Sequence, residues 1–459
     1  MNTQPDYKAF LASKAVTPAV RGLDTIPDLA PHLFPFQRNC VDFALRVGST
    51  GLFLDTGMGK TECQLEWCQK ALEATNGRAL ILTPLAVAGQ TRRRAERWGY
   101  EARVIRDQSE AGPGINICNY DRLEKLDPAA YGAVALDEAS ILKSFTGKTT
   151  RALINAFRGH RFKIAATATP APNDHMEIGQ YSEYLEIMPS NEMLMRWFIT
   201  DQTEMGRYRL KGHATRDFWR WMAAWARMAE LPSDLGDSDE GYVLPPFSVT
   251  RHRSRDSNVD GDLSDMFGIV KMNATSMHDV KRQTAVARAE TVAGIVGAEP
   301  NEPWIIWCDS NYEADALKAS IPSAVDVRGS MPVQQKEQII EGFATGQIKH
   351  LIGKPSMLGF GLDWSHCARM VFSGRSYSYE TWYQAVRRCW RFGQTRNLQV
   401  HIVVAEGEAE IGRVVERKAD DHAKMKAAMR EAMRDAIKGT RVATVDYNPT
   451  YEGRLPTWL

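Results

Sequence analysis

Residues 51–61 read GLFLDTGMGKT, an apolar run followed by a glycine-rich turn that ends in lysine and threonine. Glycines let backbone N–H groups face phosphate oxygens, and a helix that begins after such a turn points its positive end at them. Lys60 would then reach the β- and γ-phosphates, and the Thr61 hydroxyl would face magnesium. The strict pattern has glycine where this chain has Leu54, and the alternative is an ordinary turn before a helix. The stretch predicts an α/β fold with a phosphate-binding loop, whose nucleotide-binding residues are Thr56, Gly57, Met58, Gly59, Lys60 and Thr61.

A second apolar run, residues 131–138 (YGAVALDE), ends in the acidic pair Asp137 and Glu138. Asp137 would hold magnesium through water, together with Thr61, and Glu138 would position and deprotonate the attacking water. An acidic pair after a strand is also typical of an ordinary helix N-terminus. Because a phosphate loop precedes this pair in the chain, we expect it to complete a site for ATP and Mg²⁺.

Residues 384–394 read QAVRRCWRFGQ. Read as a helix, this stretch places Gln384, Arg388 and Arg391 at i, i+4 and i+7, so the three side chains share one face and Arg387 points away from it. Two guanidiniums on one stripe can clamp a triphosphate that another part of the protein holds. A solvated basic helix face is the alternative. The phosphate loop far upstream favours the clamp.

These motifs resemble those of the Swi/Snf-like family of ATP-dependent DNA translocases, within helicase superfamily two. Further segments match the family's pattern between about residue 33 and residue 404. They are 33–37 (LFPFQ), 80–85 (LILTPL), 117–120, 137–143, 167–173 with Glu177, 304–308, 327–330 with Phe343, 358–363 and 393–395, the last being the Gly-Gln-Thr ending that is most specific to the family.

The resemblance implies roles for individual residues. Lys60, Glu138, Arg388 and Arg391 would be catalytic, and Gln37 would read the adenine edge. The segment around Thr167 would couple the nucleotide state to the grip on DNA. Nucleotide binding would also involve Gly361, Asp363 and Gln384, and the nucleic-acid contacts would be Thr83, Pro84, Arg92, Thr167, Thr169 and Gly359.

Three positions depart from the family pattern. Ser140 stands where His or Asp is usual, Asp363 replaces an Asn, and Trp364 replaces a leucine. These changes concern the coupling between nucleotide and DNA more than the ATP chemistry, and they indicate a divergent member.

The composition is that of a globular protein with several domains. The 459 residues, 44% of them hydrophobic, suffice for about two or three domains. No stretch approaches the ~18 apolar residues of a membrane span, and residues 1–10 lack a signal-peptide pattern. The seven cysteines include no C-x-x-C pair, so we expect reduced, mostly buried thiols. These features predict a cytoplasmic protein without a membrane partner, in a bacterial cell or a phage-infected host.

The net charge of +1 gives no argument for nucleic acid, so any DNA contact must come from a local basic surface. For each candidate cluster, a solvated surface is the alternative. The clusters are Arg92, Arg93, Arg94 and Arg97, and then Arg251, His252, Arg253 and Arg255.

Apolar runs alternate with helical spacing in two parts of the chain, which predicts two α/β lobes with parallel sheets. The resemblance implies that these are tandem RecA-like lobes. The expected strands are 51–54, 79–82, 116–118, 134–136 and 163–166, then 304–308, 324–327, 350–352, 369–372 and 400–404. The expected domains are an N-terminal arm (1–32), a first lobe that binds ATP (33–184), a helical insertion (185–265), a second lobe (266–405) and a helical tail (406–459).

The insertion and the tail each have two interpretations. The Trp- and Met-rich stripe of the insertion indicates a packed core rather than a binding platform. The tail is interpreted as a helix that braces one lobe rather than one that binds a partner.

The sequence therefore predicts an ATP hydrolase that moves along or remodels duplex DNA, with little sequence preference. A helicase that separates DNA or RNA strands would share every ATP motif. A non-catalytic DNA-binding module would not need the intact set of Lys60, Asp137, Glu138, Arg388 and Arg391. The lack of room for accessory domains favours a minimal bacterial or phage motor.

Overall fold

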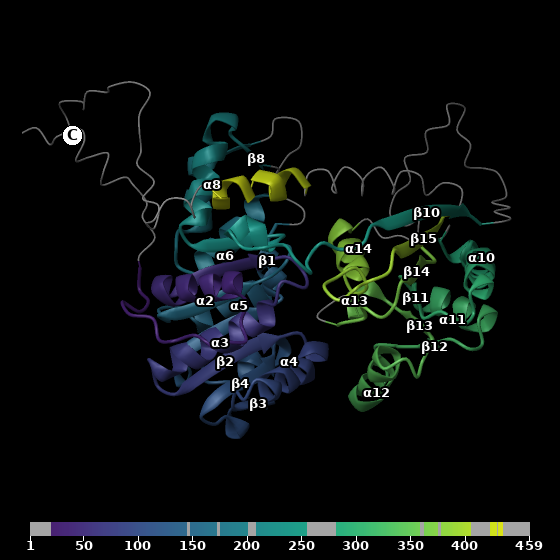
Figure 1. Cartoon of the computed structure of the whole chain (residues 1–459), viewed down its shortest axis with the longest axis horizontal. Coiled ribbons are helices and arrows are strands. Elements are labelled where there is room, and N and C mark those ends of the chain that lie inside the picture. Colours follow the sequence, from purple (N-terminus) through teal and green to yellow (C-terminus); the bar gives the residue numbers. More distant parts are fainter. Residues whose placement is uncertain are drawn as a thin grey trace, which may run out of the picture. The chain divides into compact units, whose positions relative to one another are not determined.

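The computed structural model describes residues 20–144, 147–171, 175–200, 208–254, 281–358, 362–374, 378–404, 423–428 and 430–434. The chain divides into two compact units (Figure 1). The first unit contains Met1–Asp239 and Ala423–Leu459, and the second contains Glu240–His422.

The first unit is built on a parallel seven-stranded sheet with the order β3-β4-β2-β5-β6-β1-β9. Its central strands are buried along their whole length, as expected when helices cover both faces of a parallel sheet. The strands are β1 (Ser49–Leu54), β2 (Arg78–Thr83), β3 (Ala102–Val104), β4 (Gly114–Asn119), β5 (Ala133–Asp137), β6 (Phe162–Ala166) and β9 (Ala226–Ala229).

Helices join these strands and cover the sheet. The helix that follows the phosphate loop, α3, packs on β2, β4, β5 and β6. The α-helices are α2 (Pro35–Val47), α3 (Lys60–Glu73), α4 (Leu85–Arg97), α5 (Lys148–Ala156), α6 (Ile178–Tyr184), α7 (Ser190–Trp197) and α8 (Thr215–Ala223). Short 3₁₀ helices are η1 (Gln108–Glu110), η2 (Tyr120–Lys125), η3 (Pro128–Ala130), η4 (Ala139–Lys143), η5 (His175–Glu177), η6 (Gly212–Ala214) and η7 (Pro232–Leu235).

The segment predicted as a helical insertion contributes to both sheets, so that prediction was wrong. β9 pairs in parallel with β1, with Leu54 opposite Ala229, and therefore belongs to the first unit's sheet. Its four residues, Ala-Arg-Met-Ala, lack the β-branched pattern that marks a strand in sequence. An antiparallel pair, β7 (Phe198–Thr200) and β8 (Tyr208–Leu210), also lies in this segment.

The aromatic stripe is core, as expected from its helical spacing. Phe218, Trp221 and Trp225 are fully buried, and the Trp221 ring contacts the other two. Trp225 also meets Phe53 of β1 edge to face, so the stripe supports the strand that leads into the phosphate loop.

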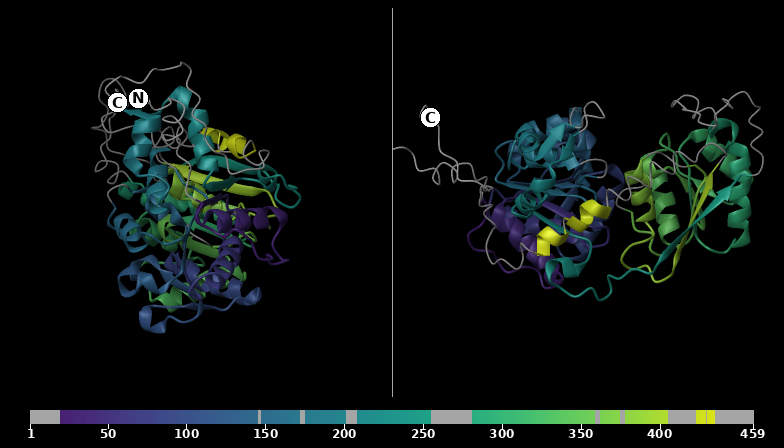
Figure 2. Two further views of the ribbon diagram at one scale, coloured as in Figure 1. Left: turned by 90° about the vertical axis from the view of Figure 1, so that its left-hand side faces the viewer. Right: turned by 90° about the horizontal axis from the view of Figure 1, so that it is seen from above.

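The second unit has a parallel six-stranded sheet with the order β10-β15-β14-β11-β13-β12, and helices lie on both of its faces (Figure 2). Its strands are β10 (Phe247–Arg253), β11 (Trp304–Trp307), β12 (Val325–Asp326), β13 (His350–Gly353), β14 (Arg369–Phe372) and β15 (Leu398–Val404). Its helices are α10 (Ala285–Ala298), α11 (Asn311–Ser320), α12 (Val333–Ala344), α13 (Pro355–Leu358) and α14 (Tyr379–Val386).

Alternate strand residues of the second unit fill two separate cores. In β11, Trp304 and Ile306 join the core beneath α10 and α11, whereas Ile305 and Trp307 join the core on the other face. Side chains of a strand alternate between faces, so an apolar run such as Trp-Ile-Ile-Trp is explained by burial on both sides. The two tandem RecA-like lobes with parallel sheets are thereby confirmed.

The edge strand β10 was assigned to the insertion, and this boundary was also wrong. β10 pairs in parallel with β15 along its whole length, so the second unit's sheet begins at Phe247. Most of its residues are exposed, and the basic run Arg251-His252-Arg253 does not read as a strand of a buried sheet. His252 Nε2 lies 2.9 Å from His401 Nδ1 on the neighbouring strand. Arg255, the fourth residue of this basic cluster, lies outside the described residues.

All seven cysteines are buried free thiols. Within the described parts of the chain, no helix is both long and apolar enough to cross a membrane.

A buried ion pair links α10 and α11 in the second unit. Arg288 and Glu313 lie 2.8 Å apart with both side chains 0% exposed. Glu313→Ala would leave the guanidinium buried without its counter-charge, so the free energy of unfolding should fall by about 3 kcal/mol. Glu290→Ala, at an exposed position of α10, is the control and should change it by less than about 0.5 kcal/mol. Denaturant titration measures both, and equal effects would contradict a stabilising role for the pair.

Candidate nucleotide site and nucleic-acid surface

The phosphate loop connects β1 to α3, and α3 begins at Lys60 as expected. Gly57 and Gly59 have φ values of 93° and 78°, in the left-handed region that favours glycine. A Cβ atom on Gly59 would lie 2.1 Å from the Gln37 side-chain nitrogen, so another residue here would displace the Gln37 side chain. The loop therefore has the close-packed, glycine-dependent form that cradles phosphate.

Lys60 lies against the loop itself. Its Nζ donates hydrogen bonds to the backbone oxygens of Leu54, at 2.9 Å, and Asp55, at 3.3 Å. The Asp55 oxygen also accepts from the Met58 N–H at 3.2 Å, which closes the turn. The ammonium group is thus held at the loop, where phosphate oxygens could replace backbone carbonyls as its partners.

Gln37 connects the start of α2 to the phosphate loop. Its side-chain oxygen accepts from the Phe34 N–H at 3.0 Å, and its side-chain nitrogen donates to the Met58 oxygen at 3.2 Å. The carboxamide is buried. Its position beside the loop is compatible with the predicted adenine contact, which stays a prediction.

Asp137 ends β5 at the centre of a buried hydrogen-bond network. Its Oδ1 accepts from Gln64 Nε2 at 2.9 Å, and its Oδ2 accepts from Thr83 Oγ1 at 3.1 Å. The Tyr120 hydroxyl donates to the Asp137 backbone oxygen at 2.7 Å, and burial together with the nearby Asp137 charge raises the Tyr120 pKa well above its ordinary value. Tyr120 therefore stays a protonated donor, and the carboxylate is fixed in place.

Sequence reasoning missed Gln64. It stands one helical turn after Lys60 on α3, so both side chains leave the same face of the helix. The four-residue spacing from Lys60 could have indicated that Gln64 faces the site. A glutamine within a helix, however, has no other sequence feature that marks a functional residue.

Glu138 has a left-handed backbone with a φ of 51°, which is uncommon for a residue other than glycine. Such conformations concentrate at functional sites, where the surrounding structure holds them. Glu138 is half-buried, as is Thr61 at the start of α3.

The residues at this edge of the sheet fit ATP with Mg²⁺. The left-handed glycines shape a phosphate cradle, Lys60 supplies a cation, and Thr61 and Asp137 supply oxygen ligands of the kind that Mg²⁺ prefers. When bound, the metal neutralises charge on the phosphates.

The two predicted catalytic arginines of the second unit do not lie on a helix face, because α14 ends at Val386. Their guanidinium groups nevertheless meet at one backbone carbonyl. Arg388 and Arg391 each donate from NH1 to the Leu362 backbone oxygen, at 3.2 and 2.8 Å. Their exposed fractions are 2% and 8%, so neither belongs to a solvated basic face. Arg391 also lies 3.5 Å from the Asp363 carboxylate.

Several side chains near these arginines are buried. Arg387 does not point into solvent, since it is buried with its guanidinium 5.0 Å from the Trp390 ring. Gln384 is also buried, and its backbone oxygen accepts from Arg388 Nε at 3.1 Å. Trp364, one of the departures from the family pattern, is part of the core.

Three of the predicted nucleic-acid contacts, Thr83, Thr167 and Thr169, are fully buried in this structure, and their contact with nucleic acid stays a prediction. Thr83 donates to Asp137, and Thr167 Oγ1 accepts from the Thr169 N–H at 3.2 Å. Pro84 is half-buried at the start of α4. Gly359 and Gly361 lie outside the described residues.

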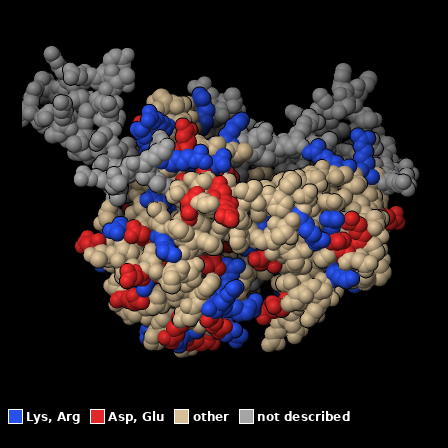
Figure 3. All heavy atoms as spheres, in the orientation of Figure 1, with Lys and Arg blue, Asp and Glu red and all other residues tan. Residues whose placement is uncertain are grey.

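The basic surface predicted after residue 85 lies on α4, where Lys and Arg side chains gather in Figure 3. Arg92, Arg93 and Arg97 are exposed. Arg92 pairs with Glu96 at 2.8 Å, and Arg94 pairs with Glu62 at 2.9 Å. The exposed Arg92–Glu96 pair contributes little to stability and leaves Arg92 available to phosphates, whereas the Arg94–Glu62 pair is half-buried.

Comparison with known proteins agrees with this geometry. Residues 287–393 match the model of the helicase conserved C-terminal domain. The chain is also similar to Swi/Snf-like proteins over most of its length. It is 27% identical over 453 residues to the SWI/SNF-related matrix-associated actin-dependent regulator of chromatin subfamily A-like protein 1 of Xenopus tropicalis, covering 89% of this chain and 47% of that protein. The Bos taurus protein of the same name is 21% identical over 423 residues, covering 83% and 43%.

The chain thus spans about half the length of the relatives that it matches. Among solved structures, S. cerevisiae Dbp5 bound to RNA and ADP BeF3 has the same fold, with a TM-score of 0.55 and 14% identity. The match covers 87% of this chain and 93% of Dbp5.

Proposed function

We propose that this chain is a Swi/Snf-like, DNA-dependent ATP hydrolase that moves along or remodels duplex DNA. The observation that carries it is the network that fixes Asp137 beside the helix of the phosphate loop. Gln64 of α3 and Thr83 of β2 each donate to one carboxylate oxygen. Such double support keeps a metal-binding carboxylate in one orientation.

In the proposed reaction, the first unit holds the nucleotide. Lys60 and the loop N–H groups bind the phosphates, and Asp137 and Thr61 hold the metal. Glu138 accepts a proton from the attacking water. Arg388 and Arg391 of the second unit stabilise the charge that develops on the transferred phosphate. Positioning and charge neutralisation supply the catalysis, and no covalent intermediate forms.

Duplex DNA is the proposed polymer. The names of the relatives reported above describe them as regulators of chromatin. In addition, the exposed arginines of α4 can contact phosphates. A helicase that separates strands of DNA or RNA is the second candidate, because Dbp5 shares the fold and is bound to RNA.

ATPase rates measured without nucleic acid and with single-stranded DNA, duplex DNA or RNA separate these candidates. Duplex DNA should stimulate hydrolysis more than RNA does, and several-fold above the rate without nucleic acid. Binding should weaken steeply as salt rises, because phosphate contacts release counterions. Sequence preference should be slight, because backbone contacts do not read bases.

Two other outcomes of these measurements would contradict the proposed function. RNA as the best activator would replace the translocase proposal with an RNA helicase. DNA binding without ATP hydrolysis under any condition would support the non-catalytic module.

A further inference from the structure

A C-terminal helical segment, 423–428 and 430–434, belongs to the first unit although the chain reaches it after the second unit. Its apolar residues Met425, Ala432 and Met433 are buried. Its basic residues Lys426, Arg430 and Arg434 recur at every fourth position and therefore share one helix face. The segment thus has one apolar side and one cationic stripe.

Each basic residue of the stripe meets an acidic residue of the first unit. Lys426 Nζ lies 2.8 Å from Glu230 Oε1, and Arg430 lies 3.1 Å from Glu230 Oε2. Arg434 pairs with the buried carboxylate of Asp234 at 3.0 Å. Three ion pairs along one helix face fix the position of the segment on the first unit more firmly than a single exposed pair would.

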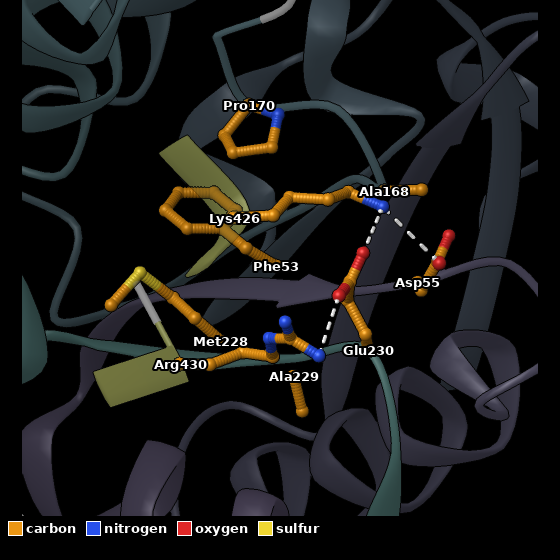
Figure 4. Close-up of a pocket in the computed structure, with 9 residues that line it drawn as sticks. All are labelled: Phe53, Asp55, Ala168, Pro170, Met228, Ala229, Glu230, Lys426 and Arg430. Atoms are coloured by element: carbon orange, nitrogen blue, oxygen red, sulfur yellow. Dashed lines mark hydrogen bonds and ion pairs between the residues drawn. The ribbon is translucent and has the colours of Figure 1, made fainter. Parts of the chain in front are cut away.

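The most enclosed of these contacts reaches the phosphate loop. Lys426 Nζ lies 3.2 Å from Asp55 Oδ2, and the two side chains are only 11% and 8% exposed. Figure 4 shows the Lys426 ammonium between the carboxylates of Asp55 and Glu230, in a small pocket that Phe53, Met228 and Pro170 also line. The Lys426–Asp55 pair is therefore largely shielded from water. An ionic contact is stronger in such a shielded site than in water.

Asp55 is the residue at which β1 ends and the phosphate loop begins. Its other carboxylate oxygen, Oδ1, accepts from the Thr56 N–H at 2.6 Å, and its own N–H donates to the Ala229 oxygen at 2.9 Å. Because β1 and β9 are parallel neighbours, Asp55 and Glu230 follow paired residues at the same edge of the sheet. Two adjacent carboxylates repel each other, and the Lys426 cation between them offsets that repulsion.

We propose that Lys426 is a positioning residue for the ATP site, which acts through Asp55 to hold the first turn of the phosphate loop. The inference rests on the proposed ATP hydrolysis. It makes the C-terminal segment part of the support of the nucleotide site, and it predicts that this segment changes the affinity for ATP rather than the chemical step.

The test uses Lys426→Met in the full chain, because methionine keeps the length and the apolar contacts but removes the charge. The KM for ATP should rise about tenfold, with a smaller change in kcat, since a displaced loop weakens ground-state and transition-state binding alike. Titration with a fluorescent ATP analogue and Mg²⁺ should show the same loss. Lys426→Arg should restore most of the affinity. Lys424→Met, at an exposed position of the same segment, should leave both constants unchanged.

A double-mutant cycle with Asp55→Asn separates positioning from general damage. Asparagine keeps the acceptor for the Thr56 N–H but loses the charge, so it should raise KM by a similar factor. The double variant should be no worse than either single variant if the two groups act as a pair. Additive losses would overturn the inference, as would identical behaviour of Lys426→Met and Lys424→Met. If Lys426→Met does not fold, an unchanged KM in Asp55→Asn overturns it.

The inference and the proposed function can fail separately. A wild-type chain that hydrolyses no ATP contradicts the proposed function, while the nucleotide titrations still decide whether Lys426 positions the loop. A hydrolysing chain with no coupling between Lys426 and Asp55 contradicts the inference alone.

Discussion

ATP turnover should fall by about 10³-fold when Glu138 is replaced by glutamine, whereas ATP affinity should stay within a few fold. Glutamine has the same size but cannot take a proton from the attacking water, and a positioned general base contributes about 10²–10⁴-fold. The position of Asp137, the proposed metal ligand, should not change, because its hydrogen bonds from Gln64 and Thr83 do not involve residue 138. Steady-state ATPase rates with duplex DNA and a nucleotide titration give the two quantities.

Two further variants make the Glu138 result specific. Lys60→Ala should lose both affinity and turnover, because its ammonium faces the phosphates before and during the reaction. Lys70→Ala, in the last turn of the same helix and 3.8 Å from Glu73, should change neither. A Glu138→Gln variant with a normal rate would rule out this assignment of the catalytic base.

Arg388→Ala and Arg391→Ala should each reduce DNA-stimulated hydrolysis by about 10³-fold, with a much smaller loss of ATP affinity. A guanidinium that stabilises charge developing on the transferred phosphate contributes mainly to the transition state. Both side chains are held by the Leu362 carbonyl, so both guanidiniums are restrained in the second unit before they act. Turnover and affinity measured on the same preparations separate the two effects.

The control for these arginines has to be chosen from the structure. The helix interpretation predicted Arg387 as a residue off the active face, but Arg387 is buried against Trp390 and its loss would damage packing. Arg396 is a better control, because it is 44% exposed and pairs with Glu302. Arg396→Ala should change turnover less than about twofold.

Two outcomes would revise the role of the arginines. Small losses in Arg388→Ala and Arg391→Ala, similar to that of Arg396→Ala, would mean that the guanidiniums only support the Leu362 backbone. Full activity of Arg391→Lys would point the same way, because a lysine cannot reproduce the planar fork of a guanidinium.

The strands and the phosphate loop were predictable because their signals are local. An apolar run buried on both faces reads as a strand wherever the rest of the chain lies, and each of the expected strands is found within a few residues of its predicted limits. β9 and β10 were missed for the opposite reason. One has four residues without a strand pattern, and the other is an exposed, basic edge strand.

The partners of single side chains were harder to predict than the strands. Thr83 was expected at a nucleic-acid surface because of its motif, yet it is buried and donates to Asp137. Arg388 and Arg391 were expected to share a helix face, yet they meet at one carbonyl after the helix has ended. A motif specifies which residues occur in a segment, whereas the partner of each side chain depends on segments that pack beside it.

The two parallel α/β lobes were predictable from the amino-acid sequence, as was the local chemistry of the loop at Lys60 and of the acidic pair at Asp137. These features follow from burial patterns and from glycine geometry within a few neighbouring residues. The contacts of Gln64 and Thr83 with Asp137, and of Lys426 with Asp55 across 371 positions of sequence, were found only in the folded chain. Such contacts have no local signature, because they form only when packing of the whole unit brings distant charged groups together and removes the water around them.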